Sequence, residues 1–223
     1  MAKSKLMTAD EAVACIKDGA VIMVGGFMTC GTPEPVMEAL ERKGVKNLTV
    51  ICNDAGYPGK GTGRLVKSGQ AKKIIVSHVG LNPEVAERMN NGTLEVVLVP
   101  QGTLAERIRA AGAGLGGVIT PTGVGTIIAD GKFEPPKQTL KIDGKDYLLE
   151  PPIHADVAIL GGTVCDEFGN TVFKGTTRNF NPLMAAAADY VIAGAEKVVK
   201  TGELDPDAIH VSGIFVDAIV GGK

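Results

Sequence analysis

The sequence has no tryptophan and few other aromatic residues, 6 Phe and 3 Tyr among 223 positions. Its net charge is −2, and the lysines and arginines are dispersed along the chain. Nucleic-acid sites usually need a basic surface and aromatic side chains on which bases can stack. The composition therefore argues against nucleic acid as a partner.

Long apolar runs are also missing. Nothing approaches the ~20 consecutive apolar residues that span a bilayer, and Asp10 and Glu11 interrupt the N-terminal region before any signal-peptide core. The four cysteines are widely spaced without a C-x-x-C pair, which predicts neither a disulfide framework nor a zinc site; they are Cys15, Cys30, Cys52 and Cys165. We expect no membrane partner and a cytoplasmic location.

Glycine is abundant, at 30 residues, nearly twice the usual ~7%. Short apolar runs recur between helix-like segments that each end in glycine, and such runs are typical of strands buried on both faces of a parallel sheet. They lie at 20–24, 48–52, 73–77, 95–99, 156–160 and 189–193. The alternation predicts an α/β fold with an open, mostly parallel sheet flanked by helices.

One interval breaks this rhythm. Asp143-Gly144 separates two strand-like arms at 139–142 and 145–149, which predicts a β-hairpin inserted at about 126–150. No fixed repeat and no long linker divides the chain. We expect one domain, 1–223, carrying this hairpin.

The stretch VGGFMTCGTPEP, residues 24–35, follows an apolar run and leads into a helical pattern. Three glycines allow positive φ angles or a close approach of ligand. Thr32 resembles an N-cap with Pro33 at the first helical position, which predicts free N–H groups that favour negative charge. Packing alone is an equal alternative. The spacing fits neither G-x-G-x-x-G nor a nucleotide P-loop.

Two amides follow other predicted strands. Asn53 comes after the run at 48–52, and Gln101 comes after the run at 95–99, with Thr103 as an N-cap candidate. In open α/β sheets the carboxyl ends of the strands border the ligand crevice. Asn53 could instead open an Asx turn, and Gln101 could be a surface amide.

Cysteine and histidine, which often act in catalysis, show no catalytic pattern in this sequence. Cys30 has no histidine tied to it by sequence, which favours a small packing residue. His78, His154 and His210 show no spacing typical of metal ligands. Arg178 and Asn179 form a polar group that could brace the sheet or meet another chain.

Together, DGAVIMVGGFMTCGTP, NDAGYPGKGTG, PQGTLAERIRAAGAG, TPTGVGT and GNTVFKGTTRNFNPLMA resemble the alpha subunits of class I coenzyme A-transferases, the 3-oxoacid CoA-transferase family, from about residue 5 to beyond 210. The likeness is greatest to subunits A of butyrate/acetate:acetoacetate enzymes. This chain has Asn53-Asp54 where relatives acting on 3-oxoacids often have Asn-Asn, and Ala111 where glycine is common.

The resemblance implies transfer of CoA between a short-chain acyl-CoA or acetoacetyl-CoA and a carboxylic acid such as acetate or butyrate. A glutamate in a Ser-Glu-Asn-Gly motif is the nucleophile, and no such motif occurs here. The resemblance therefore implies a beta subunit that supplies the glutamate, in an α2β2 or larger assembly. It also implies no tightly bound cofactor, since CoA and acyl-CoA would be substrates.

The resemblance also implies site residues. Asn53 would lie on the oxyanion side, and Gln101 would contact the substrate carboxylate. The CoA-binding loop would comprise Gly25, Gly26, Phe27, Met28, Thr29, Cys30 and Gly31. Two other functions stay open: a non-catalytic module that binds CoA esters or sugar phosphates, and a phosphosugar isomerase with its own acid and base.

Overall fold

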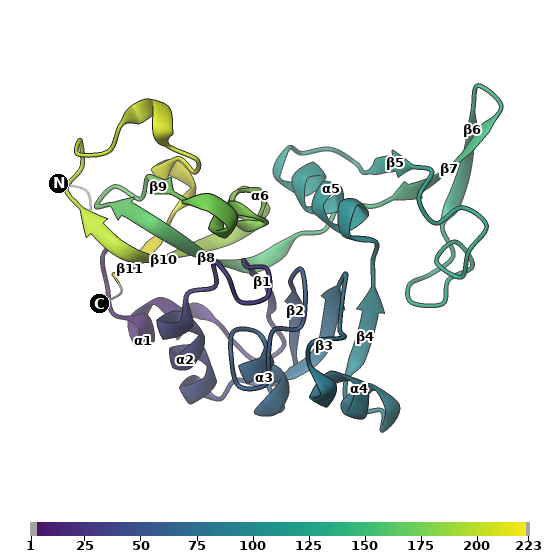
Figure 1. Cartoon of the computed structure of the whole chain (residues 1–223), viewed down its shortest axis with the longest axis horizontal. Helices are drawn as coiled ribbons and strands as arrows, with labels where there is room; N and C mark the ends of the chain where they lie inside the picture. The colour runs from purple at the N-terminus through teal and green to yellow at the C-terminus, as the bar shows by residue number, and fades with distance from the viewer. Residues whose placement is uncertain (1–3, 222–223) are drawn as a thin grey trace.

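The computed structural model describes residues 4–221, which form a large sheet and a small one (Figure 1). In the large sheet seven strands run parallel to their neighbours in the order β11-β10-β8-β1-β2-β3-β4, and β9 pairs antiparallel with β8. The strands are β1 Val21–Val24, β2 Leu48–Ile51, β3 Ala71–Val76, β4 Glu95–Leu98, β8 Ala155–Asp166, β9 Thr171–Val172, β10 Ala188–Val199 and β11 Ala218–Gly221. The expected open, mostly parallel sheet is confirmed.

Helices cover both faces of this sheet because successive strand residues point to opposite sides. Ile22 and Val24 pack with the helices of one face, whereas Met23 belongs to the core of the other. The first face carries α1 Ala9–Ala12, α2 Glu34–Lys43, α3 Gly63–Lys67 and α4 Pro83–Asn90; the second carries α5 Gln101–Gly112 and α6 Asn181–Ala185. Short 3-10 helices occupy Val13–Cys15, Gly175–Arg178, Pro206–Ala208 and Gly213–Phe215.

The order of the strands reverses at β1. From β1 the chain proceeds outward through β2, β3 and β4, and it then returns to the other side of β1 as β8 before continuing to β10 and β11. Ligands of open α/β sheets bind outside the carboxyl ends of the strands at such a switch point. The glycine-rich stretch follows β1 directly and therefore lies at this point.

The small sheet projects beyond the far end of α5 (Figure 1). Its order is β5-β7-β6, from Val118–Thr120, Lys145–Glu150 and Gln138–Ile142. Asp143 and Gly144 join β6 to β7 with φ angles of 49° and 76°, as expected for a two-residue hairpin turn. The hairpin is confirmed, although β5, which pairs with β7, was not predicted.

Buried charges fasten this small sheet to α5. Arg107 on α5 binds Glu134 in two parallel hydrogen bonds of 2.7 and 3.0 Å. Lys137 lies 2.7 Å from Glu134 and 3.0 Å from Glu150. Burial acts to raise the pKa of Glu134, but the hydrogen bonds and positive charges of Arg107 and Lys137 outweigh it and hold the pKa at about 2.

The sequence patterns predicted most of the helices and strands, but several of the predicted ends differ from the structure. The capping box of Thr8 and Glu11 is present at α1. The long strands β8 and β10 continue well past the predicted runs, and β9, β11, α3 and α6 were not predicted. These segments are too short to show a clear periodicity, so tertiary packing defines them.

Two features bear on possible sites. Among residues 4–221, no helix combines the length and apolarity needed to cross a membrane. The same residues bring together no group of three or more His, Cys, Asp or Glu side chains able to hold a metal ion.

Candidate functional site

The glycine-rich loop after β1 is a tight hairpin at the switch point of the sheet. Phe27 and Cys30 exchange two backbone hydrogen bonds of 3.0 and 2.9 Å, and the two residues between them have left-handed φ angles, 49° at Met28 and 66° at Thr29. Such angles are unfavourable for side chains like methionine and β-branched threonine. Backbone strain of this kind clusters at functional sites.

The glycines make this hairpin possible through contacts inside the chain. Gly26 has a φ of 133°, and a Cβ there would lie 2.0 Å from Thr32 Oγ1. A Cβ on Gly25 would lie 1.8 Å from Asn181 Oδ1. On β8, a Cβ on Gly161 would meet the Gly31 carbonyl at 2.2 Å. Close packing of the chain against itself thus already explains why glycine stands at these positions.

Most backbone N–H groups of the loop are already used. Those of Gly25, Phe27 and Cys30 donate to backbone carbonyls, that of Gly26 to Asn179 Oδ1, and that of Met28 to Asp54 Oδ2. The N–H groups of Thr29 and Gly31 have no acceptor among residues 4–221. These two are therefore the donors that the loop can offer to a ligand.

The predicted N-cap at Thr32 is wrong. The helix α2 begins at Glu34 with Pro33 as its N-cap, and the Thr32 hydroxyl donates to the Gly25 carbonyl at 2.8 Å. Pro35 has no N–H, and the Val36 N–H donates to Pro33. The start of α2 therefore offers few free donors, and the prediction that it favours an anion loses its basis.

Two asparagines from a distant segment hold the loop from the other side. Asn179 accepts from Gly26 N at 3.2 Å and donates to the Cys30 carbonyl at 2.9 Å. The fully buried Asn181 accepts from Gly161 N at 2.9 Å and donates to the Gly31 carbonyl at 3.0 Å. Asn179 thus braces the loop rather than the sheet, and its contact with another chain stays a prediction.

The ends of β2 and β4 bring the two predicted amides together. Gln101 Nε2 donates to Asn53 Oδ1 at 2.7 Å, and Ser77 Oγ at the end of β3 lies 3.1 Å from the same oxygen. Asn53 Nδ2 donates to Asp54 Oδ2 at 2.8 Å. Asn53 is only 2% exposed, whereas Gln101 lies at the surface.

Asp54 is the residue that the sequence patterns missed. Its carboxylate, 5% exposed, also accepts from Gly56 N at 2.9 Å. That bond to the residue two positions ahead is the Asx turn considered for Asn53, so the turn belongs to Asp54. The spacing Asp-Ala-Gly in NDAG is the local signal that could have identified it.

The predicted N-cap at Thr103 is also wrong. The helix α5 begins at Gln101 after Pro100, so Thr103 is a buried residue of its first turn. Gln101 therefore stands on the rigid first turn of a helix. This placement fixes the backbone of the exposed amide beside Asn53.

The four cysteines lie in two different environments, two exposed and two buried. Cys30 is exposed and its Sγ lies 3.2 Å from Thr176 Oγ1, so its predicted role as a packing residue is wrong. Burial and the charge of Asp54 raise the pKa of Cys52. Burial likewise raises the pKa of Cys165, to about 11. Both buried cysteines therefore remain thiols.

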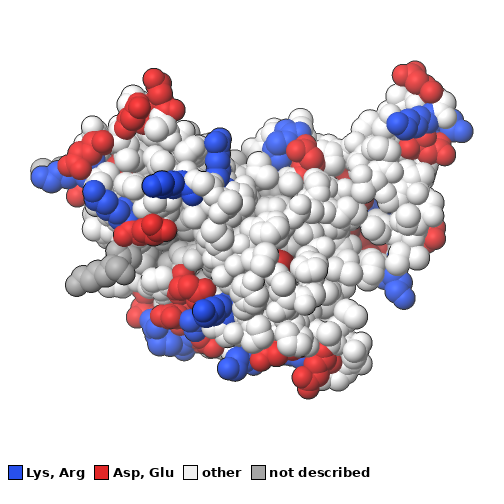
Figure 2. Space-filling view, in the orientation of Figure 1, with Lys and Arg blue, Asp and Glu red and all other residues white. Residues whose placement is uncertain are grey.

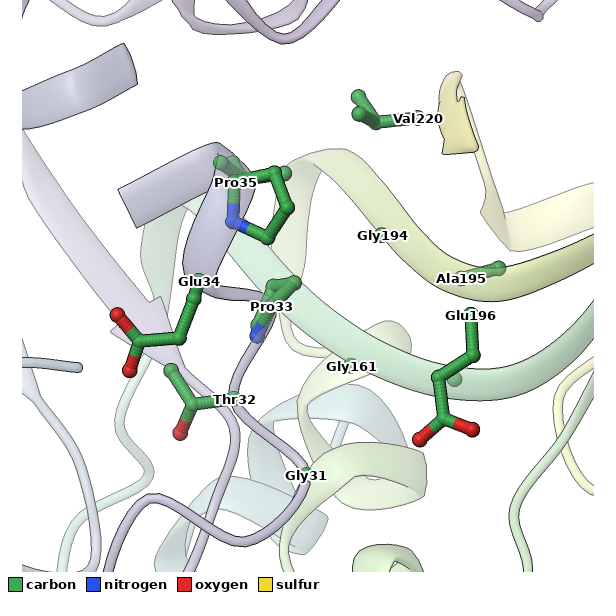
Figure 3. A pocket seen from close by; sticks show the side chains of 12 residues that line it. Gly31, Thr32, Pro33, Glu34, Pro35, Gly161, Gly194, Ala195, Glu196 and Val220 are labelled. Carbon is green, nitrogen blue, oxygen red and sulfur yellow. The ribbon is translucent and has the colours of Figure 1, made fainter. Parts of the chain in front are cut away.

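A cavity of about 250 Å³ lies on the other side of the loop, between the start of α2 and the glycine-lined strands β8 and β10 (Figure 3). Neither Asn53 nor Gln101 lines it. Its carboxylates are Glu34 and Glu196, and Glu34 is bound to Arg64 and to Gly61 N. These acidic walls do not suit a phosphate-bearing ligand.

Charged side chains gather along the margins of the face in Figure 2, and its centre, near β1, is almost free of them, although α5 carries the exposed Glu106–Arg109 pair. The tip of the loop adds apolar surface, with Phe27 41% and Met28 40% exposed. Depletion of charge with exposed aromatic and methionine side chains is typical of the core of a protein interface.

This chain is similar in sequence to known proteins over nearly its whole length. The chain is 50% identical over 218 residues to the acetate CoA-transferase subunit alpha of Escherichia coli K12, covering 98% of this chain and 97% of that protein. It is 47% identical over 217 residues to the acetoacetyl-CoA:acetate/butyrate CoA transferase alpha subunit of Clostridium acetobutylicum, covering 97% of each.

A solved structure of a CoA transferase also has the same fold. The acyl-CoA transferase YdiF of Escherichia coli O157:H7 superposes with a TM-score of 0.86 at 26% identity, over 98% of this chain and 47% of that one. This chain thus spans about half the length of YdiF. The family described as Coenzyme A transferase matches residues 6–222. The chain therefore belongs to the coenzyme A transferase family.

Proposed function

We propose that this chain is the alpha subunit of an enzyme that exchanges CoA between acetoacetyl-CoA or a short-chain acyl-CoA and acetate or butyrate. The 50% identity to an acetate CoA-transferase alpha subunit over nearly the whole of both chains carries the proposal. The similar acetoacetyl-CoA:acetate/butyrate subunit supports the choice of substrates.

The second half of the site belongs to a beta subunit. No Ser-Glu-Asn-Gly motif occurs in this sequence, and the chain matches about half the length of YdiF. The charge-poor centre of the face in Figure 2 and the exposed Phe27 and Met28 at the loop tip offer apolar surface for that subunit. We expect an assembly of two alpha and two beta subunits or a multiple of it.

The reaction proceeds by two exchanges at the glutamate of the beta subunit. Its carboxylate attacks the thioester carbonyl and expels CoA thiolate, which forms an acyl-glutamyl anhydride. The thiolate then attacks the glutamyl carbonyl and expels the first carboxylate, leaving a glutamyl-CoA thioester. The second acid reverses both steps, so no water is consumed.

This chain supplies uncharged donors for the negative charge that develops on the thioester oxygen. The proposed donors are the N–H groups of Thr29 and Gly31, which have no acceptor among the described residues, and the second N–H of Asn53 Nδ2. Gln101 contacts the incoming carboxylate. Preorganised donors of this kind stabilise an oxyanion. Neutral amides do so without forming a salt bridge to the attacking glutamate.

Reconstitution tests the proposal. The chain alone should not transfer CoA between acetoacetyl-CoA and acetate or butyrate, and mixing with the cognate beta subunit should restore activity. The control is a beta subunit with the motif glutamate replaced by glutamine, which should assemble and stay inactive. Turnover by this chain alone, or an active complex with that control, contradicts the proposal.

A further inference from the structure

We propose that Asp54 is a positioning residue that decides which way the amide groups of Asn53 and Gln101 face; only its effect on activity rests on the proposed function. Three donors converge on the Asp54 carboxylate, namely Met28 N, Asn53 Nδ2 and Gly56 N, at 2.8, 2.8 and 2.9 Å. A carboxylate accepts hydrogen bonds and donates none. The atom of Asn53 that faces it must therefore be the nitrogen.

The orientation of Asn53 then dictates that of Gln101. Because an amide carries its nitrogen and oxygen on opposite sides, Asn53 Oδ1 points toward Gln101 and Ser77. Because that oxygen accepts, Gln101 must turn its own nitrogen toward it, and Gln101 Nε2 donates to Asn53 Oδ1 at 2.7 Å. Its Oε1 and its second N–H are left without a partner among residues 4–221, facing away from Asn53.

No other member of this group can set the direction. The Ser77 hydroxyl donates to the Asn53 backbone carbonyl at 2.8 Å, and a hydroxyl can accept from Asn53 as readily as donate to it. Gln101 is exposed and can turn its amide over. Without a carboxylate at position 54, Asn53 and Gln101 could reverse together and keep the hydrogen bond between them.

The same oxygen also couples the amides to the strained hairpin. Asp54 Oδ2 accepts from both Met28 N and Asn53 Nδ2. An asparagine at position 54 has nearly the same shape, but its NH₂ group would face at least one of the three donors. Gly56 N donates to Oδ1 alone, so Asp54→Asn can place its NH₂ group there and keep both bonds of Oδ2. Asp54→Ala instead removes both oxygens, which frees the loop and releases the direction of the amides.

Nuclear magnetic resonance of the nitrogen-15-labelled full chain tests the orientation without reference to activity. In the native chain, the Asn53 side-chain amide protons should show a cross-relaxation signal to the Met28 backbone proton. In Asp54→Ala this signal should weaken or vanish and the Gln101 side-chain amide resonances should shift. Asp143→Asn, an equal loss of charge in the exposed β6–β7 turn, should change neither.

Kinetics of the assembled enzyme give the second readout. Misplaced reacting groups can cost about 10²-fold in rate, so Asp54→Ala should lower kcat/KM by about 10- to 100-fold and Asp143→Asn should not. If the Asn53 side-chain protons of the native chain contact Ser77 and Gln101 instead of Met28, the inference is overturned, even if Asp54→Ala does not fold. Unchanged Gln101 side-chain resonances in folded Asp54→Ala also overturn it. An inactive native complex contradicts the proposed function alone.

Discussion

Gln101 Nε2 and Asn53 Oδ1 lie 2.7 Å apart, which joins the first turn of α5 to the end of β2. One partner is buried and the other exposed. The pair therefore has a fixed inner end and an accessible outer end. Substitutions at the two ends should have different kinetic effects.

Asn53→Ala should act mainly on kcat. Loss of one oxyanion donor typically costs about 10²-fold or more in rate, and Asn53 also holds Gln101 in place. Steady-state kinetics of the assembled variant, with acid and acyl-CoA varied separately, measure the effect. A near-native kcat would reduce Asn53 to a structural residue of the strand end.

Gln101→Ala should chiefly raise KM for the carboxylic acid. A contact made equally in the ground and transition states affects binding rather than kcat, and the exposed side chain leaves no cavity when it is shortened. The same two-substrate kinetics separate the constants. A fall in kcat with an unchanged KM would instead place Gln101 on the oxyanion.

Gly26→Ala should destabilise the loop and lower activity. Its φ of 133° is strained for any side chain, and the new Cβ would collide with Thr32 Oγ1; such strain costs about 1–3 kcal/mol. Thermal unfolding and kinetics of the complex measure both effects. Gly116→Ala is the control because no atom lies within 4 Å of its added Cβ. Equal behaviour of the two variants would show that the loop tolerates a side chain.

Cys30 should be the cysteine whose alkylation depends on ligand. Cys15 and Cys30 are the exposed thiols among the described residues, and burial raises the pKa of Cys15. Mass spectrometry of the assembled enzyme should show acyl-CoA slowing the alkylation of Cys30 more than that of Cys15. Cys30→Ser should remain active. Ligand-independent alkylation of Cys30 would argue against contact between the loop and CoA.

Acid should weaken the junction between the small sheet and α5. A carboxylate whose folded pKa is lowered contributes stability above its unfolded pKa, and the contribution is lost as the pH falls. For Glu134 this loss should occur as the pH falls from about 4.5, the ordinary pKa, to about 2, the pKa in the folded chain. Urea unfolding across this pH range should show a steeper fall in the free energy of unfolding for the native chain than for Glu134→Gln. Glu106→Gln, at an exposed pair with Arg109, should behave like the native chain.

The strand ends were predictable because apolar runs reveal buried strands and parallel strands end at one edge. This reasoning was enough to place Asn53 and Gln101 on the same edge. The partners of the loop were not predictable in this way. Asn179 and Asn181 reach Gly26 and Gly31 across most of the chain, and no local pattern records such a contact.

The two incorrect N-caps have a common cause. A threonine before a helical pattern favours a cap by local propensity, but Thr32 uses its hydroxyl to close the loop onto Gly25 and Thr103 is drawn into the core. Tertiary packing outweighs a cap worth about 1 kcal/mol. Asp54 was overlooked because its role lies in three bonds that only the folded chain assembles.

The position of β1 between β2 and β8 also has a consequence for biosynthesis. The β1–β2–β3–β4 half is built from neighbours in sequence, whereas β1 meets β8 through pairs such as Ile22 with Val157. Non-local strand pairing is slow, and an unpaired strand edge invites aggregation. While the chain emerges from the ribosome, one edge of β1 stays unpaired until the second half is made. During that interval the exposed edge of β1 can pair with another chain.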